Sequence, residues 1–493
     1  MADKHPPSRP ARLWRKLRNR PLKSLLFLVV LVYLGTAIGH VYKPLPEGLN
    51  ADYPPRAAED VDFLVDATWI AADRSQQQNT EIFERVIELV NQAEQLVVVE
   101  MFLLNEFAGA SGADHRPLSS MLLDALIQKK AQRPGMTVVL IVDPFNRLYG
   151  GVEAPALDEA EAAGVEVIET RLSALPDSNP VWSGIWRLCC RFLGNSTEGW
   201  LPNPVGGESV SLRTYLTLLN FKANHRKSLV VDQGTSWTGL VTTGNAHDAS
   251  SRHSNVGVVF SGAAAIDLLE TMRATARFSG VEPDWPIPEV QSAAGQSEDS
   301  LARVLSEVSI REVILELIDD SLEGERLDLA LFYLSQRDII ESIAAAHRRG
   351  VDVRLLMDPN EDAFGRKKDG VPNRQVALEL HDQGIPIRWC NTRGEQCHYK
   401  HLLHIDQDQQ ASLLVGSANY TRRNLDGFNL ETQVLIEASA DHAQIIEAAR
   451  FFDQRWSNEG EREHSLPYAA YEDTSRWRYW RYRFMEATGL STF

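Results

Sequence analysis

The longest apolar stretch of the chain covers residues 24–42, which include no Asp, Glu, Lys or Arg. As an α-helix rising about 1.5 Å per residue, it would be roughly 28 Å long, close to the thickness of a bilayer core. Residues 1–23 precede it with eight basic side chains and one acid. Because basic flanks stay in the cytoplasm, the pattern predicts a basic cytoplasmic stub over 1–23 and a transmembrane anchor over 24–42.

This arrangement predicts a single-pass protein of the inner (cytoplasmic) membrane, with its N-terminus in the cytoplasm and its body on the periplasmic or extracellular side. A cleaved signal peptide is the alternative. No A-x-A cleavage pattern follows the apolar run, which favours an uncleaved anchor.

Beyond the anchor, short apolar strands alternate with helical patterns, and the alternation occurs twice. Such alternation predicts βαβ units and the fold class α/β, with two similar halves over 60–280 and 301–460. Residues 281–300, rich in Pro, Ser, Gln and acids, are expected to be a linker, and residues 461–493 a C-terminal tail. The predicted strands cover 96–102, 138–142 and 165–168 in the first copy, and 327–332, 353–357 and 385–389 in the second.

The first half carries an insert at about residues 170–217. An apolar, helix-like cluster lies within it, formed by Trp182, Ile185, Trp186, Leu188, Phe192 and Leu193. Packed core is the default interpretation of such a cluster, and a dimer contact or a membrane-facing surface are the alternatives.

Charge and cysteine content restrict the function further. The net charge is −17, and the body alone is more acidic because the stub is basic. An acidic body argues against a general nucleic-acid binder, which usually carries a basic surface. Of the four cysteines, Cys390 and Cys397 could close a short loop, whereas the adjacent Cys189 and Cys190 rarely bond each other. Four free thiols are the default expectation.

One short chemical pattern occurs in both halves. A histidine and a lysine two residues apart are followed by an aspartate, and an asparagine comes 13 residues after that aspartate. On a strand, the histidine and the lysine point to the same face. Two copies inside an independent repeat are far more specific than one. The residues are His225, Lys227, Asp232 and Asn245 in the first copy, and His398, Lys400, Asp406 and Asn419 in the second.

These residues resemble the signature of the phospholipase D superfamily, a duplicated H-x-K-x4-D. The similarity covers roughly residues 60–460, and the stretch 416–424 is especially similar to the bacterial branch that includes cardiolipin synthases. The resemblance implies two phospholipase D-like halves, with mixed sheets flanked by helices, packed pseudo-twofold so that both motifs meet in one site. It implies no cofactor and no metal. Its candidate catalytic residues are His225, Lys227, Asp232, Asn245, His398, Lys400, Asp406, Asn419 and Glu431, with Ser417 and Thr243 as candidate substrate-binding residues.

The second motif departs from the signature by one extra residue between Lys400 and Asp406, which a β-bulge could absorb. The first half departs from it as well. Counting 12 residues from each motif asparagine places Gly257 at the position of Glu431, so the acid is absent there and the halves are not equivalent.

The resemblance implies a ping-pong reaction. His225 is assigned as the nucleophile and His398 as the general acid and base, and the reverse assignment stays open. Lysines and asparagines would neutralise the phosphoryl oxygens, and Glu431 would orient an imidazole. Asp232 and Asp406 are expected to support the loop after each strand. His401 and His404 show ligand-like spacing for a helix, but on a strand they face opposite ways, so no metal is expected.

The tail alternates arginines with aromatics over residues 476–484. This pattern suits a membrane interface, a stacking platform for single-stranded nucleic acid, or a terminal helix with solvated arginines. An anchor at the other end favours the membrane over nucleic acid.

The leading hypothesis is a phosphatidyltransferase or phosphodiesterase that acts on membrane phospholipids in the manner of a cardiolipin synthase. Its expected partners are the phospholipid substrate and the membrane. The alternatives are a hydrolase releasing phosphatidic acid, a nuclease, which the acidic body opposes, and a non-catalytic lipid-binding pseudo-enzyme. The oligomeric state is not indicated.

Overall fold

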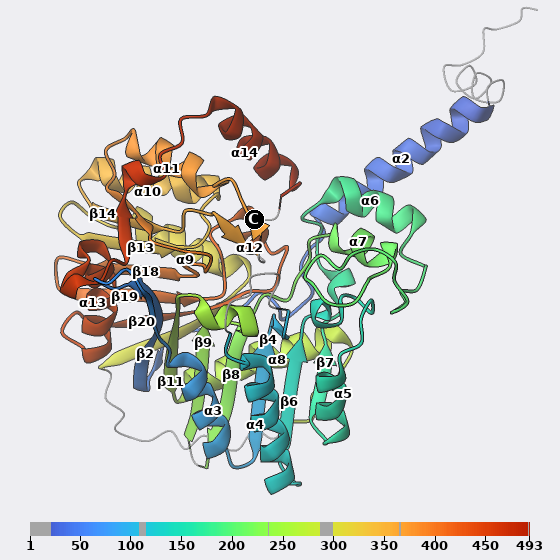
Figure 1. Cartoon of the computed structure of the whole chain (residues 1–493), viewed down its shortest axis with the longest axis horizontal. Helices are drawn as coiled ribbons and strands as arrows, with labels where there is room; N and C mark the ends of the chain where they lie inside the picture. Colours follow the sequence, from blue (N-terminus) through green and yellow to red (C-terminus); the bar gives the residue numbers. More distant parts are fainter. Residues whose placement is uncertain (1–20, 108–114, 235, 286–298, 364–365, 492) are drawn as a thin grey trace, which may run out of the picture.

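The computed structural model describes residues 21–107, 115–234, 236–285, 299–363, 366–491 and 493. Most of the expected basic stub, and residues 286–298 of the expected linker, lie outside these ranges. The apolar stretch forms one helix, α2 (Pro21–Val41), which projects from the body (Figure 1). This helix is long and apolar enough to cross a membrane, and nearly all of it is exposed.

The first half is built on an eight-stranded mixed sheet with the order β3-β2-β11-β9-β8-β4-β6-β7. β4, β6 and β7 run parallel, and the other neighbours are antiparallel. The apolar sequences of β4 and β6 are buried along almost their whole length, as expected for central strands covered on both faces. The strands are β2 (Glu59–Ile70), β3 (Gln76–Asn79), β4 (Leu96–Met101), β6 (Thr137–Val142), β7 (Glu166–Glu169), β8 (Lys227–Gln233), β9 (Ser236–Thr242) and β11 (Asn255–Ser261).

The second half repeats this order in a nine-stranded sheet, β1-β12-β20-β19-β18-β13-β14-β17-β21. Its parallel trio β13, β14 and β17 corresponds to β4, β6 and β7, and β18, β19 and β20 correspond to β8, β9 and β11. The prediction of two similar α/β halves is therefore confirmed. The strands are β1 (Arg56–Ala57), β12 (Ser300–Ser306), β13 (Arg326–Leu331), β14 (Asp352–Met357), β17 (Ile387–Cys390), β18 (Lys400–Ile405), β19 (Gln410–Gly416), β20 (Thr432–Ser439) and β21 (Ser465–Pro467).

Helices flank both sheets (Figure 1). The halves meet through a shared hydrophobic cluster, to which α8 of the first half and α13 of the second contribute together with strands of both sheets. The short strand pairs are β5 (Leu104–Asn105) with β10 (Ala246–His247), and β15 (Asp362–Ala363) with β16 (Arg366–Lys367). The helices are α3 (Ile82–Gln92), α4 (Leu118–Gln132), α5 (Pro155–Ala162), α6 (Pro180–Cys189), α7 (Leu212–Leu218), α8 (Ala263–Ser279), α9 (Val308–Asp319), α10 (Arg337–Arg349), α11 (Asn373–His381), α12 (Arg422–Leu425), α13 (Ala443–Ser457) and α14 (Arg476–Thr488).

The apolar cluster of the insert does not form packed core, which corrects the default expectation for it, although Leu172 and Leu175 at the start of the insert are buried in a small hydrophobic cluster. Only Ser183 and Gly184 of α6 are buried. Gly184 faces α2 so closely that a Cβ would lie 2.9 Å from the Tyr33 ring, and the Tyr33 hydroxyl donates to the carbonyl of Val181 (3.0 Å). Val181, Ile185 and Leu188 of α6 remain exposed beside the membrane-type helix, whereas Trp182 and Trp186 are half-buried.

The extra residue of the second motif is not absorbed by a bulge, which corrects that expectation. The pairing of β18 with β19 runs without a shift from His401–Val415 to Ile405–Ala411. The hairpin turn takes up the difference, because β18 ends at Ile405 and Asp406 lies in the turn, where it accepts from the N–H of Gln410 (2.8 Å).

Both cysteine pairs are joined in the structure, one between Cys390 and Cys397 and one between the adjacent Cys189 and Cys190. The default expectation of four free thiols is therefore wrong. The tail is also more integrated than expected, since β21 completes the second sheet before α14 begins.

Candidate active site

The two motif histidines lie at the boundary between the halves. His225 comes just before β8 and His398 just before β18. The backbone N–H of His225 donates to the carbonyl of Leu430 (2.9 Å), and that of His398 donates to the carbonyl of Ser254 (2.8 Å). Each acceptor belongs to the opposite half, so the backbone of each motif histidine is held in place by the other half of the molecule. Both side chains are more than nine-tenths buried.

Glu431 of the second half holds the histidine of the first. Its Oε2 lies 3.0 Å from His225 Nδ1, and it also accepts hydrogen bonds from Ser417 and Asn424. Burial alone would raise the pKa of Glu431, but the charges of His225 and Lys227 and the bond from Ser417 lower it below its usual value. The carboxylate is therefore ionised, so His225 Nδ1 carries the proton and Nε2 carries the lone pair.

His398 has an amide partner in place of a carboxylate. Asn255 Oδ1 lies 3.2 Å from His398 Nδ1. The hydroxyl of Thr243 donates to the same Oδ1 (3.1 Å), and Asn255 Nδ2 donates to the carbonyl of His253 (3.3 Å). These two bonds fix the orientation of the amide, so its oxygen accepts from His398 Nδ1–H and leaves Nε2 toward the site.

Asn255 is the structural counterpart of Glu431, which corrects the alignment to Gly257. The loop after the motif asparagine is two residues shorter in the first half, so counting along the sequence overshoots. Asn255 was missed for this reason, and matching the strand that follows the asparagine turn would have found it. The strand pairs that set the equivalence are Gly257 with Thr242 and Gln433 with Gly416.

The two lysines are buried beside the histidines, and no carboxylate of the described residues is bonded to either. Lys227 Nζ donates to the carbonyl of His225 (2.5 Å) and Lys400 Nζ to that of His398 (3.1 Å). Each ammonium also lies over a phenylalanine ring, 5.1 Å from the centroid of Phe102 for Lys227. Burial lowers the pKa of Lys227 to about 7 and lowers that of Lys400 well below its usual value.

Burial also lowers the pKa of both histidines. That of His225 falls to about 4 despite the opposing charge of Glu431, and that of His398 falls well below 6.5, where the neighbouring Lys400 adds to the effect. Two lysines and two histidines thus share one buried site, in which Glu431 is bonded to His225 and the buried carboxyl groups of Asp143 and Asp358 lie near enough to act on Lys227 and Lys400. An anion bound beside the two lysines would stabilise their charged forms.

The other predicted residues divide into two groups. Asn245 and Asn419 are buried at the ends of the motif turns, and Asn419 Oδ1 has no hydrogen-bond partner among the described residues. Thr243 and Ser417 are fully buried, and their hydroxyls bond to Asn255 and Glu431. Their hydroxyls thus bond to the two residues that hold Nδ1 of the motif histidines.

Asp232 and Asp406 lie at the far ends of their strands from the histidines. Asp232 Oδ1 accepts from the backbone N–H groups of Glu94 (3.2 Å), Gln95 (2.7 Å) and Leu96 (2.7 Å), where β4 begins. Asp406 closes the hairpin turn after β18. These contacts fit the expected role of both aspartates in supporting the loop after each strand. Neither aspartate lies beside the motif histidines and lysines.

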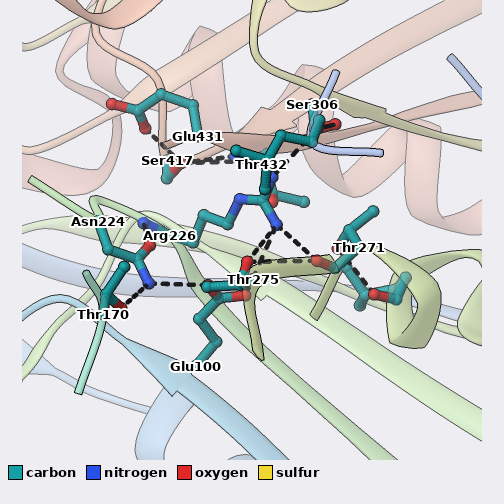
Figure 2. A network of polar contacts seen from close by, with 12 residues as sticks. Glu100, Thr170, Asn224, Arg226, Thr271, Thr275, Ser306, Ser417, Glu431 and Thr432 are labelled. Atoms are coloured by element: carbon teal, nitrogen blue, oxygen red, sulfur yellow. Dashed lines mark hydrogen bonds and ion pairs between the residues drawn. The ribbon is translucent and has the colours of Figure 1, made fainter. Parts of the chain in front are cut away.

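Arg226 lies between the two motif residues His225 and Lys227, and its side chain contacts Thr271 and Thr275 of α8 (Figure 2). Its fully buried guanidinium donates to the Thr271 carbonyl (3.0 Å) and the Thr275 hydroxyl (3.0 Å), and forms an ion pair with Glu307. Glu307 in turn accepts from the backbone N–H of Glu431 (2.8 Å). These contacts connect Arg226 of the first motif, through Glu307, with Glu431, the acid bonded to His225. The sequence indicated no role for Arg226 beyond its place next to the motif histidine.

His401 and His404 do not share a site. His401 is fully buried with its ring 5.1 Å from that of Phe451, and His404 Nε2 lies 2.8 Å from Glu325 Oε2. In the described ranges, no group of three or more His, Cys, Asp or Glu side chains is arranged to hold a metal ion.

Comparisons with known proteins agree with this architecture. Residues 314–456 match the family described as "Cardiolipin synthase, PLD-like domain". The phosphatidylserine synthase of Haemophilus influenzae Rd KW20 has a similar fold, with a TM-score of 0.54 and 12% identity over 89% of this chain and 94% of that one. Nuc from Salmonella typhimurium, a phospholipase D family member, aligns over 33% of this chain and 99% of its own at 22% identity, with a TM-score of 0.25. No curated protein matches the sequence.

Proposed function

We propose that the chain is a phospholipase D-like, membrane-anchored enzyme that transfers or hydrolyses the phosphodiester of phospholipids, which the family match over residues 314–456 and the fold similarity to a phosphatidylserine synthase support. The observation that carries the proposal is the buried group of two histidines and two lysines with one carboxylate, Glu431, bonded to His225. The exposed apolar helix α2 supports a membrane substrate, since it would hold the body at the bilayer.

In the proposed reaction, His225 Nε2 attacks phosphorus and the bond from phosphorus to the leaving alcohol breaks. Protonated His398 gives its Nε2 proton to the departing alkoxide. An acceptor alcohol or water then loses a proton to His398 and attacks phosphorus, and the phosphorus–nitrogen bond breaks. Lys227 and Lys400 neutralise the phosphoryl oxygens in both steps.

The unequal partners of the histidines support this division of roles. Phosphorylation of His225 Nε2, with Nδ1 still protonated, gives the ring a positive charge, which the Glu431 carboxylate stabilises. His398 has only the neutral amide of Asn255, so it releases a proton more readily. The assignment of His225 as nucleophile thus has a physical reason beyond the regular spacing of its motif.

The product test uses full-length protein in detergent with labelled phosphatidylglycerol, with and without added alcohol. New cardiolipin or a new phosphatidyl alcohol is expected for transfer, and phosphatidic acid for hydrolysis. No product from a broad panel of lipids would contradict the lipid-enzyme proposal. Rapid cleavage of DNA under the same conditions would instead favour a nuclease.

Glu431→Gln keeps the shape of the side chain and removes its charge. We expect kcat to fall about 10²- to 10⁴-fold, because the imidazole loses the carboxylate that fixes its tautomer and stabilises its positive charge. The measurement is turnover of labelled lipid at saturating substrate. Glu437→Gln, on the strand β20 that begins just after Glu431, lies outside the site; it is the matched control and should retain wild-type turnover. A rate for Glu431→Gln within threefold of wild type would overturn the role given to Glu431.

The lowered pKa values of the lysines predict a pH-dependent anion affinity. Without ligand, Lys227 loses its proton as the pH rises through about 7. A bound anion favours the charged form, so binding above pH 7 must take up protons, and affinity should fall by up to about tenfold per pH unit for each titrating lysine. Titration calorimetry with sulfate, whose charge is constant from pH 6 to 9, measures both effects.

Lys227→Arg is the control for this titration, because a guanidinium stays charged throughout that range. We expect a shallower pH dependence and less proton uptake than in the wild type. Sulfate affinity that does not change between pH 6 and 9 would contradict the proposed anion site.

A further inference from the structure

The C-terminal helix α14 presents a row of large apolar side chains to solvent. Trp477, Trp480 and Phe484 are 75%, 67% and 59% exposed, and their spacing places them on one face of the helix. The opposite face packs on the second half, where Tyr482 and Glu486 are buried and the Ser335 hydroxyl donates to Glu486 (2.8 Å). The helix is therefore held firmly with its aromatic row outward.

α14 is joined to the base of α2. Gly489, just after the helix, packs so closely on the insert that a Cβ would meet the Ser178 carbonyl at 1.8 Å. The neighbouring Asp177 donates its backbone N–H to the carbonyl of His40 (3.0 Å) at the end of α2. Arg187 of α6 forms an ion pair with the Asp177 side chain (2.6 Å) and so stabilises this contact with the end of α2.

A second exposed apolar surface lies on α6, which packs directly on α2. α2, α6 and α14 all lie on the same side of the molecule (Figure 1). The exposed apolar residues of the α6 region are Val181, Ile185, Leu188, Phe192 and Leu193. Apolar surface on three adjoining elements exceeds the scattered exposure that is normal for a soluble surface.

We propose that the exposed faces of α6 and α14 lie in the interfacial region of the bilayer that α2 spans. Lipid is the occupant because α6 packs on α2 and the end of α14 contacts the segment that joins α6 to α2. Tryptophans beside arginines are also the side chains typical of the headgroup level. The inference rests on the proposed membrane-spanning role of α2, and it is independent of the phosphodiester chemistry.

The same contacts connect the lipid surface with the active site. After α14 the chain returns inward, where Arg423 donates to the carbonyl of Ser491 (2.5 Å) and Phe493 packs on Tyr333 (ring centroids 6.3 Å apart). Tyr333 adjoins Phe332, whose ring lies 4.9 Å from that of His398. Binding of α14 to the membrane interface would thus hold His398 and the second motif at a fixed distance from the lipid headgroups.

The test uses full-length protein in nanodiscs that hold one copy each, made from ordinary or brominated phospholipid. The fluorescence due to the two exposed tryptophans is obtained by subtracting the Trp477→Phe/Trp480→Phe variant from wild type. If α14 lies in the interface, this difference should be at least about twofold smaller in brominated discs, and iodide in the buffer should barely quench it. Trp69→Phe, at a site on β2, is the control, and its difference should not respond to bromine.

Each other outcome would overturn the proposal. Quenching by iodide and not by brominated lipid would place α14 in water. Quenching by neither reagent would mean that another part of the same chain covers the row, since each disc holds one copy. A matched surface change, Leu322→Ser/Ile446→Ser, replaces exposed apolar residues elsewhere and should leave the tryptophan signals unchanged.

Discussion

His398→Ala is expected to release one equivalent of nitrophenolate from phosphatidyl-p-nitrophenol and then stop, whereas His225→Ala should release none. Nitrophenolate leaves without a proton, so the first step no longer needs His398 as an acid. The second step still needs His398 as a base, and the reaction therefore halts at the covalent stage. His225 has no such substitute, because it supplies the attacking atom.

With a natural phospholipid, both variants should lose at least about 10³-fold in turnover, because an alkoxide needs a proton to leave. His442→Asn is the matched control. His442 caps α13 away from the site through its ring nitrogen, and asparagine caps helices well, so wild-type rates are expected. A nitrophenolate burst from His225→Ala, and none from His398→Ala, would reverse the two roles.

Arg226→Met is expected to cause the largest loss of stability of any single change considered. The substitution leaves Glu307 and Glu100 as buried carboxylates without their cation, at 0% side-chain exposure. Breaking one partner of a buried ion pair costs about 3–5 kcal/mol. Urea unfolding of the detergent-solubilised protein, followed by intrinsic fluorescence, measures the change in the free energy of unfolding.

Arg450→Met is the control for stability, because it removes an arginine from an exposed pair with Glu447 on α13. Such surface pairs contribute at most about 1 kcal/mol. Equal unfolding midpoints for the Arg226 and Arg450 variants would contradict the importance given to the buried network.

Much of the fold could be predicted because its signals are local. The apolar strands ending in Asp-Pro, the helical spacing between them and the uncharged run of α2 depend on neighbouring residues alone. The motif histidines and lysines could be found for the same reason, since strand alternation relates their side chains. The role of Glu431 followed from the resemblance, and the structure adds that it reaches across to His225 of the other half.

What could not be predicted depends on loop lengths and on packing between distant elements. Asn255 was missed because one loop is shorter than its counterpart, and Arg226 because its partner Glu307 is 81 residues away. The helical spacing of apolar residues predicted the apolar cluster of α6. It could not predict that α6 packs on α2, because that contact joins segments far apart in the sequence.

The most direct test of the central claim is to identify the residue that becomes covalently modified. His398→Ala, mixed with phosphatidyl-p-nitrophenol and stopped after the burst, is digested under alkaline conditions that preserve phosphohistidine and analysed by mass spectrometry. We expect a phosphatidyl group on the peptide that contains His225, at about one per chain. A burst of nitrophenolate with no modification of His225, or with modification at another residue, would contradict that claim.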